Sequence, residues 1–385
     1  MIVVSINGFF DAWELRKLGE IVERVTRKNK NLESSLPLTI SAQYGLIDQN
    51  DFFNKIVASR DVSGYYLVKN GEFAYNKSYS SGYPLDAIKR LDRYDMGVLS
   101  TLYIVFKPIK IDSEFLAKYY DTTYWHREVS KHAAEGARNH GLLNIAASNF
   151  FETELKFPIE TEEQVQIGSF FKSLDETIAL HQRKLDILKQ MKKGFLQQLF
   201  PENEEKVPGV RFADFDEEWA MCKLGASVEN IGTGSSSFSS GVLKSGTTPY
   251  EVLGSTSVIS YDNDFDYSGD FVLTARVGAN AGKLYKHSGD VKISDNTVYI
   301  QSSELDFIFS LLDRSDLKRL SFGTGQPLIK ASELKNLILA FPTNRKEKAK
   351  IGKFFSKFDD TIALHQQKLD QLKTLKKAYL RNMFI

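Results

Sequence analysis

Two basic segments of the chain contain the residue types that bind DNA. YNKSYSSGYPLDAIKR runs from Tyr75 to Arg90, and TARVGANAGKLYKH runs from Thr274 to His287. Arginine can pair with guanine and asparagine with adenine through two hydrogen bonds each, and lysine contacts phosphates. Glycine in such a loop lets the backbone approach a duplex closely. We predict DNA contacts here, with an ordinary exposed hairpin as the alternative. The candidates are Asn76, Lys77, Tyr79, Ser81, Tyr83, Lys89, Arg90, Arg276, Asn280, Lys283 and Lys286.

A second group of candidates lies outside these two segments. Thr324 and Gln326 lie in a glycine-flanked turn before an expected helix. The loop GTGSSSFSSG, residues 232–241, is either a further contact or simply a flexible loop. Arg127 and Arg138 complete the group.

No set of residues has the spacing of a catalytic or metal site. No glycine-rich loop precedes a Lys-Ser/Thr pair, and no Asn-Pro-Pro-aromatic tetrapeptide of an amino-methyltransferase is present. His126, His132 and His140 are six and eight residues apart, which does not place them on one turn of a helix. Glu154/Lys156 and Glu333/Lys335 resemble the E-x-K pair of some nucleases, but they do not occupy matching positions in the two halves. We therefore predict no catalytic residue, no metal ligand and no cofactor in this chain.

The overall composition is that of an ordinary soluble protein. Its 385 residues carry a formal net charge of +1, so total charge does not identify a nucleic-acid binder. Cys222 is the only cysteine, which excludes an internal disulfide and fits a reducing cytoplasm. No apolar run reaches the roughly 18 residues of a membrane helix, and the start lacks the pattern of a signal peptide. We expect a cytoplasmic protein without membrane contact.

The chain repeats itself. Residues 158–200 and 342–384 align without gaps, with 22 of 43 positions identical, and share the sequence TIALHQ. The resemblance extends upstream with a falling offset: Trp13 corresponds to Trp219, and Gly71 to Gly269. The loops between these points differ in length and sequence. One fold therefore presents two unlike surfaces, each followed by a long helix.

Both long segments have apolar residues in a 3–4 alternation that indicates a coiled-coil seam. Thr161 with Gln164, and Asn344 with Glu347, have the spacing of capping boxes. His181 and His365 occupy matching seam positions, as do Lys192 and Lys376. Such polar layers commonly set register, and a pH switch or a ligand role is the alternative. The predicted seam residues are Leu174, Ile178, His181, Leu185, Leu188, Phe358, Ile362, His365, Leu369 and Leu372.

The predicted fold is α+β, with two strand-rich α/β domains separated by two long antiparallel coiled-coil helices in an internal pseudo-twofold repeat. Antiparallel pairing is favoured because two helices of similar length can then bury their seams against each other within a domain–helix–domain–helix chain. The second helix carries a charge of +7 and the first carries none. The segment 201–218 contains seven acidic residues and is predicted to be a solvated linker. The domain boundaries are 1–157, 158–200, 201–218, 219–341 and 342–385.

This layout resembles the specificity subunit of type I restriction–modification systems. The resemblance covers about 10–384 and is carried by FFKSLDETIALHQRKLDILKQMKKGFLQQLF with its copy, by GQPLIKASELKNLILAFP, and by the Trp-led entries to the two halves. It implies two target-recognition domains that each read one half of a split, asymmetric DNA sequence. It also implies that the helices set the unread gap and dock two methyltransferase subunits, which restriction/translocase subunits then join.

The resemblance implies a reader of double-stranded DNA without catalytic activity of its own. S-adenosylmethionine, ATP and magnesium are then expected on the partner subunits. Two other readings stay open at this point: a metal-dependent nuclease with a degenerate acidic site, and a coiled-coil adaptor without DNA contact.

Overall fold

The computed structural model describes residues 13–41, 44–76, 87–132, 145–202, 205–320 and 328–384. These residues form two compact units. The first comprises Met1–Leu180 and Leu369–Ile385, and the second comprises His181–Lys368. The predicted contacts Lys77, Tyr79, Ser81, Tyr83, Thr324 and Gln326, together with Arg138, lie outside the described residues.

The first unit is built on a four-stranded antiparallel sheet of order β2-β9-β6-β7. Its central strands are runs of β-branched and aromatic residues, which favour a buried strand. Smaller two-stranded sheets pair β1 with β10, β3 with β4 and β5 with β8. The strands are β1 (Glu14–Lys17), β2 (Val22–Val25), β3 (Leu38–Ser41), β4 (Gly45–Asp48), β5 (Tyr66–Lys69), β6 (Phe73–Tyr75), β7 (Ile88–Arg90), β8 (Met96–Leu99), β9 (Ile104–Pro108) and β10 (Glu154–Phe157). The helices are α1 (Leu18–Ile21), α2 (Gln49–Phe53), α3 (Ser113–Tyr119), α4 (Tyr124–His132) and α5 (Ala147–Phe151).

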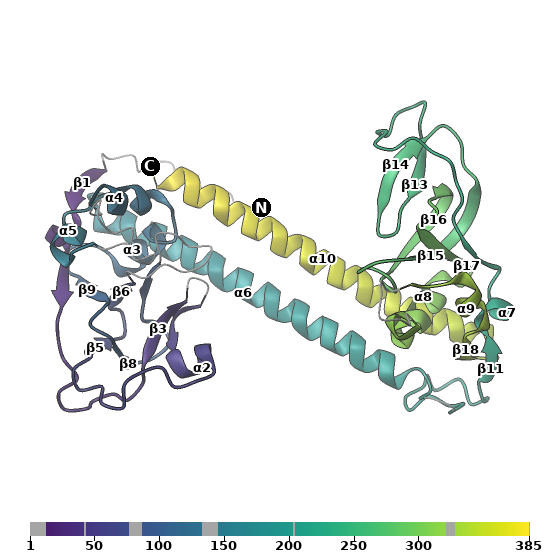
Figure 1. Cartoon of the computed structure of the whole chain (residues 1–385), viewed down its shortest axis with the longest axis horizontal. Coiled ribbons are helices and arrows are strands. Elements are labelled where there is room, and N and C mark those ends of the chain that lie inside the picture. Colours follow the sequence, from purple (N-terminus) through teal and green to yellow (C-terminus); the bar gives the residue numbers. More distant parts are fainter. Residues whose placement is uncertain are drawn as a thin grey trace. The chain divides into compact units, whose positions relative to one another are not determined.

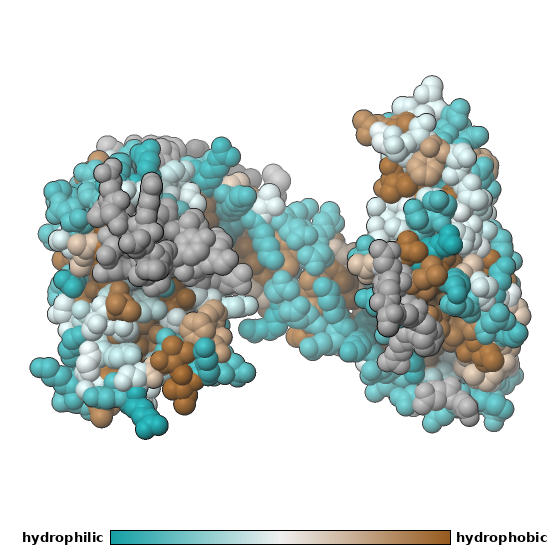
Figure 2. Space-filling model, viewed as in Figure 1, coloured by the Kyte–Doolittle hydropathy of each residue, from teal (hydrophilic) through white to brown (hydrophobic). Residues whose placement is uncertain are grey.

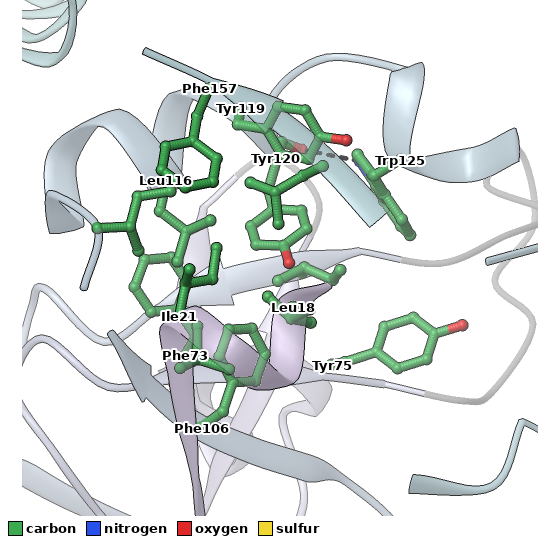
Figure 3. Packing of buried hydrophobic residues seen from close by; sticks show 14 of the residues in the cluster. Leu18, Ile21, Phe73, Tyr75, Phe106, Leu116, Tyr119, Tyr120, Trp125 and Phe157 are labelled. Atoms are coloured by element: carbon green, nitrogen blue, oxygen red, sulfur yellow. Dashed lines mark hydrogen bonds between the residues drawn. The ribbon is translucent and has the colours of Figure 1, made fainter. Parts of the chain in front are cut away.

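An aromatic core fills the space between this sheet and its helices (Figure 3). Phe73 and Phe106 stack across neighbouring strands with ring centroids 5.4 Å apart. Tyr120 packs against both rings, and Trp125 donates its indole N–H to the Tyr120 carbonyl at 3.2 Å. Burial of such large rings removes much apolar surface from water and so stabilises this unit.

The second unit contains a six-stranded sheet of order β12-β17-β15-β16-β13-β14 and the pair β11-β18. All neighbours are antiparallel except β13 and β16. The strands are β11 (Ala220–Lys223), β12 (Asn230–Thr233), β13 (Tyr250–Leu253), β14 (Val258–Asp262), β15 (Tyr267–Ala275), β16 (Leu284–Ile293), β17 (Thr297–Gln301) and β18 (Ile338–Phe341). The helices are α7 (Leu224–Ser227), α8 (Leu305–Ser315) and α9 (Ala331–Asn336), with a 3₁₀ turn at Leu317–Leu320.

The two units repeat one scaffold. The order β2-β9-β6-β7 of the first corresponds to β12-β17-β15-β16 of the second, and the pair β1-β10 corresponds to β11-β18. Gly168 and Gly352 are equivalent, and each lies against the start of the corresponding helix, α3 or α8. What differs is attached to this scaffold: β3-β4, α2 and β5-β8 in the first unit, and β13-β14 in the second. The fold is therefore α+β with two strand-rich domains and an internal repeat, as the sequence predicted.

Two long helices, α6 (Thr161–Gln198) and α10 (Arg345–Met383), contribute a segment to each unit (Figure 1). They run antiparallel in both. In the first unit Phe170 packs on Tyr379 with ring centroids 5.1 Å apart, and in the second Phe195 packs on Phe354 at 5.2 Å. Leu185, Leu369 and Leu372 of the predicted seam are buried, and its other seven members are half-buried. Apolar packing at heptad spacing thus holds the helices together in each unit.

Each unit contains the same cluster of four aromatic rings, and one ring always comes from the end of the other repeat's helix. In the first unit Phe384 lies between Trp13, Phe115 and Phe171 at centroid distances of 6.3, 5.3 and 5.8 Å. In the second unit the equivalent Phe200 contacts the rings of three residues at 6.0, 5.9 and 5.9 Å, namely Trp219, Phe307 and Phe355. The end of each helix is therefore a core element of the domain it reaches.

The predicted linker at 201–218 has its described acidic side chains exposed, but its second half also makes contacts with α10 that the sequence did not predict. Arg211 donates two hydrogen bonds, of 2.7 and 2.8 Å, to the Glu347 carboxylate, whose side chain is 1% exposed. Phe212 packs on Phe354, and Lys350 pairs with Asp214 at 2.6 Å. Among the described acidic residues of the segment, Asp214 pairs with a lysine of α10, and the local sequence does not reveal these contacts.

The capping boxes are confirmed only in part. Asn344 accepts a hydrogen bond from the Lys346 N–H at 2.9 Å and so caps α10, but the Glu347 carboxylate binds Arg211 and does not return to Asn344. Thr161 is already the first residue of α6. The Gln164 side chain instead accepts from the Asp112 N–H and donates to the Pro158 carbonyl, both at 2.8 Å. Tertiary contacts have replaced the local ones at these positions.

Candidate nucleic-acid interface

Arg276 is an exposed arginine on a fixed backbone. It follows β15 directly, its N–H donates to the Asn296 carbonyl at 2.9 Å, and its carbonyl accepts from the Ile329 N–H at 2.8 Å. No described side chain forms a hydrogen bond or ion pair with the guanidinium. A donor held on rigid backbone and left unpaired is what bidentate recognition of a guanine edge or a phosphate requires.

Asn280 and Lys283 lie on the same turn as Arg276. The turn is closed by hydrogen bonds from Ala281 N to Gly278 O and from Lys283 N to Asn280 O, both 2.9 Å. Gly278 and Gly282 have positive φ values of 86° and 83°, and a Cβ at Gly282 would lie 2.9 Å from the Lys318 nitrogen. Both candidate side chains are exposed, and neither is paired within the described part of the chain. The glycines thus allow a compact turn, and a bridge between Ala275 and Ala281 brings its backbone back beside the strand end that carries Arg276.

Lys286 has a partner inside the fold. Its ammonium lies 2.7 Å from the Asp306 carboxylate, 4.0 Å from Asp359 and 5.0 Å from the centre of the Phe309 ring. Its contact with DNA stays a prediction, but these neighbours already explain its position on β16.

Lys89 and Arg90, on β7, are also held by carboxylates. Lys89 pairs with Asp121 at 2.7 Å, and Arg90 pairs with Glu114 at 2.7 Å and Asp92 at 2.6 Å. Burial would lower the pKa of Arg90, but the two carboxylates outweigh that effect and raise it. Asn76, at the end of β6, is half-buried, and its backbone N–H points to the Ala87 carbonyl at 3.5 Å. DNA contacts of these residues also stay predictions.

A cavity of about 610 Å³ lies next to β7 in the first unit. Its wall includes three aromatic side chains, Phe73, Tyr120 and Trp125. Its charged lining is balanced: four cations, Lys89, Arg90, Lys118 and Lys376, face four carboxylates, Asp92, Glu114, Asp121 and Asp175. Such a lining gives no net attraction for phosphate. The cavity is therefore a weaker candidate for DNA contact than residues 276–283, called here the Arg276 turn.

A repeated cluster of ion pairs is not predicted by the sequence analysis. Lys192 lies 2.7 Å from Asp359 and 2.9 Å from Asp313 in the second unit. Lys376 is the equivalent lysine in the first unit. It lies 2.6 Å from Asp175 and 3.7 Å from Asp121, which is near the end of α3. Each lysine therefore ties the partner helix and the domain together. The signal in the sequence is the matching position of the two lysines in the repeat, which by itself indicates only a polar seam layer.

Electrostatic pairing shifts the titration of these groups. Burial would lower the pKa of Lys192, but hydrogen bonds to Asp359 and Asp313 more than compensate and raise it. Burial would likewise raise the pKa of Asp121, whereas Lys89 and Lys376 lower it overall. Both shifts favour the charged form of the side chain, that of Lys192 in one cluster and that of Asp121 in the other.

The structure also has an exposed apolar patch that was not predicted from the sequence. It lies on α2 and the residues that follow it, in the first unit (Figure 2). Phe52 and Phe53 are 46% and 45% exposed and pack edge to face, while Ile56 is 84% exposed. The run FFNKIV in an otherwise polar segment is the signal for it. Patches of this kind are a common feature of interaction surfaces.

Membrane spans and metal-ligand clusters are both absent from the described residues. None of the helices there is long and apolar enough to cross a membrane. No group of three or more His, Cys, Asp or Glu side chains with metal-ligand geometry is found in the same part of the chain.

Comparison with solved structures reveals the same fold elsewhere. A specificity subunit of a type I restriction-modification system from M. genitalium aligns over 98% of both chains with a TM-score of 0.66 and 14% identity. A second structure, described as the structural basis of complex assembly and conformational transition of the type I restriction-modification system, aligns over 97% of both chains with a TM-score of 0.51 and 16% identity. At these identities the similarity establishes the fold alone.

Sequence comparison is more specific. The specificity subunit of the type I restriction enzyme MjaVIII, from Methanocaldococcus jannaschii, is 24% identical over 260 residues. That match takes in 59% of this chain and spans 60% of the length of the relative. The family model described as type I restriction modification DNA specificity domain matches residues 11–190 and 216–374, one match for each repeat. The chain therefore belongs to the family of the type I restriction modification DNA specificity domain.

Proposed function

We propose that this chain is the DNA sequence-specificity subunit of a type I restriction–modification enzyme and recognises a bipartite, asymmetric target. The observation that supports this most directly is that the two copies of one scaffold carry different additional strands and helices. The same four-stranded order carries β3-β4, α2 and β5-β8 in the first unit, but β13-β14 in the second. Two domains with a common core and different surroundings can read two different half-sites.

The distribution of charge supports DNA contact through local surfaces. A net charge of +1 gives little non-specific attraction, so binding would depend on a few well-placed side chains and on partner subunits. In the second domain the Arg276 turn is the strongest candidate, because its arginine, asparagine and lysine have no partner among the described side chains. The excess of +7 on residues 342–385 would add to a basic channel or face an acidic partner.

The same proposal assigns catalysis to partner proteins. Two methyltransferase subunits would dock on this chain, and restriction/translocase subunits would join them. S-adenosylmethionine, ATP and magnesium would then be bound by those subunits. The helix pair would set the unread gap between the half-sites. The relation to a structure whose description concerns complex assembly in a type I system supports a multisubunit setting.

Methylome sequencing of host DNA with and without this gene tests the proposal. A split methyl-adenine motif that disappears on deletion and returns on complementation is the expected result. An unchanged methylome would favour an adaptor without DNA contact. Metal-dependent cleavage of DNA by the purified chain alone would favour a nuclease.

A further inference from the structure

Two histidines face each other in the seam of the second unit. The Nδ1 atoms of His181, on α6, and His365, on α10, are 3.3 Å apart, and the ring planes are tilted by 46°. The two residues occupy equivalent positions in the repeat, so the antiparallel pairing brings a position together with its own copy. Both side chains are half-buried, which leaves one side of the pair accessible to water.

The distance between the nitrogens is suited to a shared metal ion. Two imidazole nitrogens that bind one tetrahedral zinc ion at roughly 2.0–2.1 Å lie about 3.3 Å from each other. Without a metal ion the same separation fits a hydrogen bond between the rings, in which the tautomers decide which nitrogen donates. The pair is thus placed as two adjacent ligands are placed.

Metal ions bind the neutral form of imidazole, so a positive charge beside the pair opposes the site. Lys184, on α6, is close enough to His365 to act on it electrostatically. We expect its charge to weaken the binding of a cation there.

We propose that His181 and His365 form a two-histidine site for a divalent transition-metal ion of the zinc, nickel or copper class, with water as the remaining ligands. Such ions prefer imidazole nitrogen, whereas magnesium and calcium prefer oxygen. The site joins α6 to α10, so bound metal stabilises the folded chain. This proposal departs from the expectation of a chain without metal ligands, and it is independent of DNA recognition.

Calorimetric titration of the full chain, purified without a polyhistidine tag, with zinc, nickel and copper salts tests the site. We expect one ion per chain. His181→Ala and His365→Ala should each lose at least the roughly tenfold in affinity that loss of a supporting group costs a metal site. His126→Ala, which alters a half-buried histidine on α4, is the matched control and should bind as the unmodified chain does. Lys184→Gln should bind the metal more tightly, because it removes the opposing charge.

Two further measurements separate ligation from a structural effect of the substitutions. The electron paramagnetic resonance spectrum of the copper-loaded chain should show hyperfine coupling to two imidazole nitrogens. His365→Gln keeps hydrogen-bonding capacity and should stay folded by circular dichroism, yet lose the metal-dependent rise in Tm. Absence of saturable binding, unchanged affinity in both alanine variants, or a spectrum without imidazole coupling would overturn the proposal.

Discussion

The cations predicted to contact DNA fall into two chemical groups. Lys89, Arg90 and Lys286 each have a carboxylate within 2.7 Å, so their charge is already used within the fold. Arg276 and Lys283 have no such partner among the described residues. Sequence spacing could identify all five as basic, but it could not separate the groups. Asp92 is close to Arg90 along the chain, but the carboxylates that pair with Lys89 and Lys286, and the second partner of Arg90, lie 20 or more residues away.

The first prediction concerns Arg276. Arg276→Ala should weaken binding of the assembled complex to its target by ~1–3 kcal/mol if this residue reads a base. Arg276→Lys keeps the charge but removes the two-pronged geometry, so it should restore phosphate binding without restoring base selection. Fluorescence anisotropy with target and base-substituted duplexes at several salt concentrations measures both effects. Equal recovery by lysine on every duplex would assign Arg276 to a phosphate.

A second prediction concerns the acid dependence of the ion-pair cluster. The pKa of Asp121 is lower in the folded chain than its usual value, so its contribution to stability is present above the unfolded pKa of about 3.9 and is lost as the pH falls through the folded value. Asp121→Asn should therefore lower the free energy of unfolding by about 1–2 kcal/mol at neutral pH. Urea unfolding between neutral and acidic pH checks this. The difference from the unmodified chain should be constant near neutrality and shrink below about pH 4.

At the scale of the elements, the sequence predicted the repeated helices but not the tertiary contacts between distant segments. The heptad spacing located both long helices, and the buried Leu185 and Leu369 lie on the predicted seam. The fold of the linker could not be predicted, because Arg211 meets Glu347 across 136 residues of chain. The Gln164 side chain likewise accepts a hydrogen bond from the distant Asp112 N–H and does not form the predicted capping box. Local spacing therefore gave the elements, and distant contacts fixed how they dock.

The helix glycines give a prediction at this scale. A Cβ on Gly168 or Gly352 would lie 2.8 Å from the backbone nitrogen of Phe115 or Phe307, which leaves no room for alanine. Gly168→Ala and Gly352→Ala should each destabilise the chain by about 1–3 kcal/mol, because the start of α3 or α8 must move away.

Gly194 provides the matched control, since it lies in α6 and a Cβ added there would meet no atom within 4 Å among the described residues. Gly194→Ala should stabilise the chain by about 0.5–1 kcal/mol through helix propensity alone. Thermal unfolding followed by circular dichroism measures all three variants. Stabilisation by all three would show that the close approach of α3 to α6, and of α8 to α10, is not required.

At the scale of the whole molecule, the repeated scaffold predicts exchangeable recognition. Replacement of residues 1–157 by the corresponding domain of another family member should change one half of the methylated motif and leave the other intact. Methylome sequencing of cells that express the chimera gives the result directly. Changes in both halves would mean that the two domains do not read independently.

Phe384 fills the aromatic cluster of the first unit, although Trp13, Phe115 and Phe171 of that cluster are all made long before it. During synthesis on the ribosome, the first domain therefore emerges with an incomplete aromatic cluster. The cluster is completed only when translation has reached Phe384, at the end of the second repeat. In the second domain, by contrast, Phe200 is synthesised before Trp219 and Phe307, so it is already available when the rest of the cluster emerges. Nascent chains stalled within the second repeat should therefore expose apolar surface and recruit chaperones.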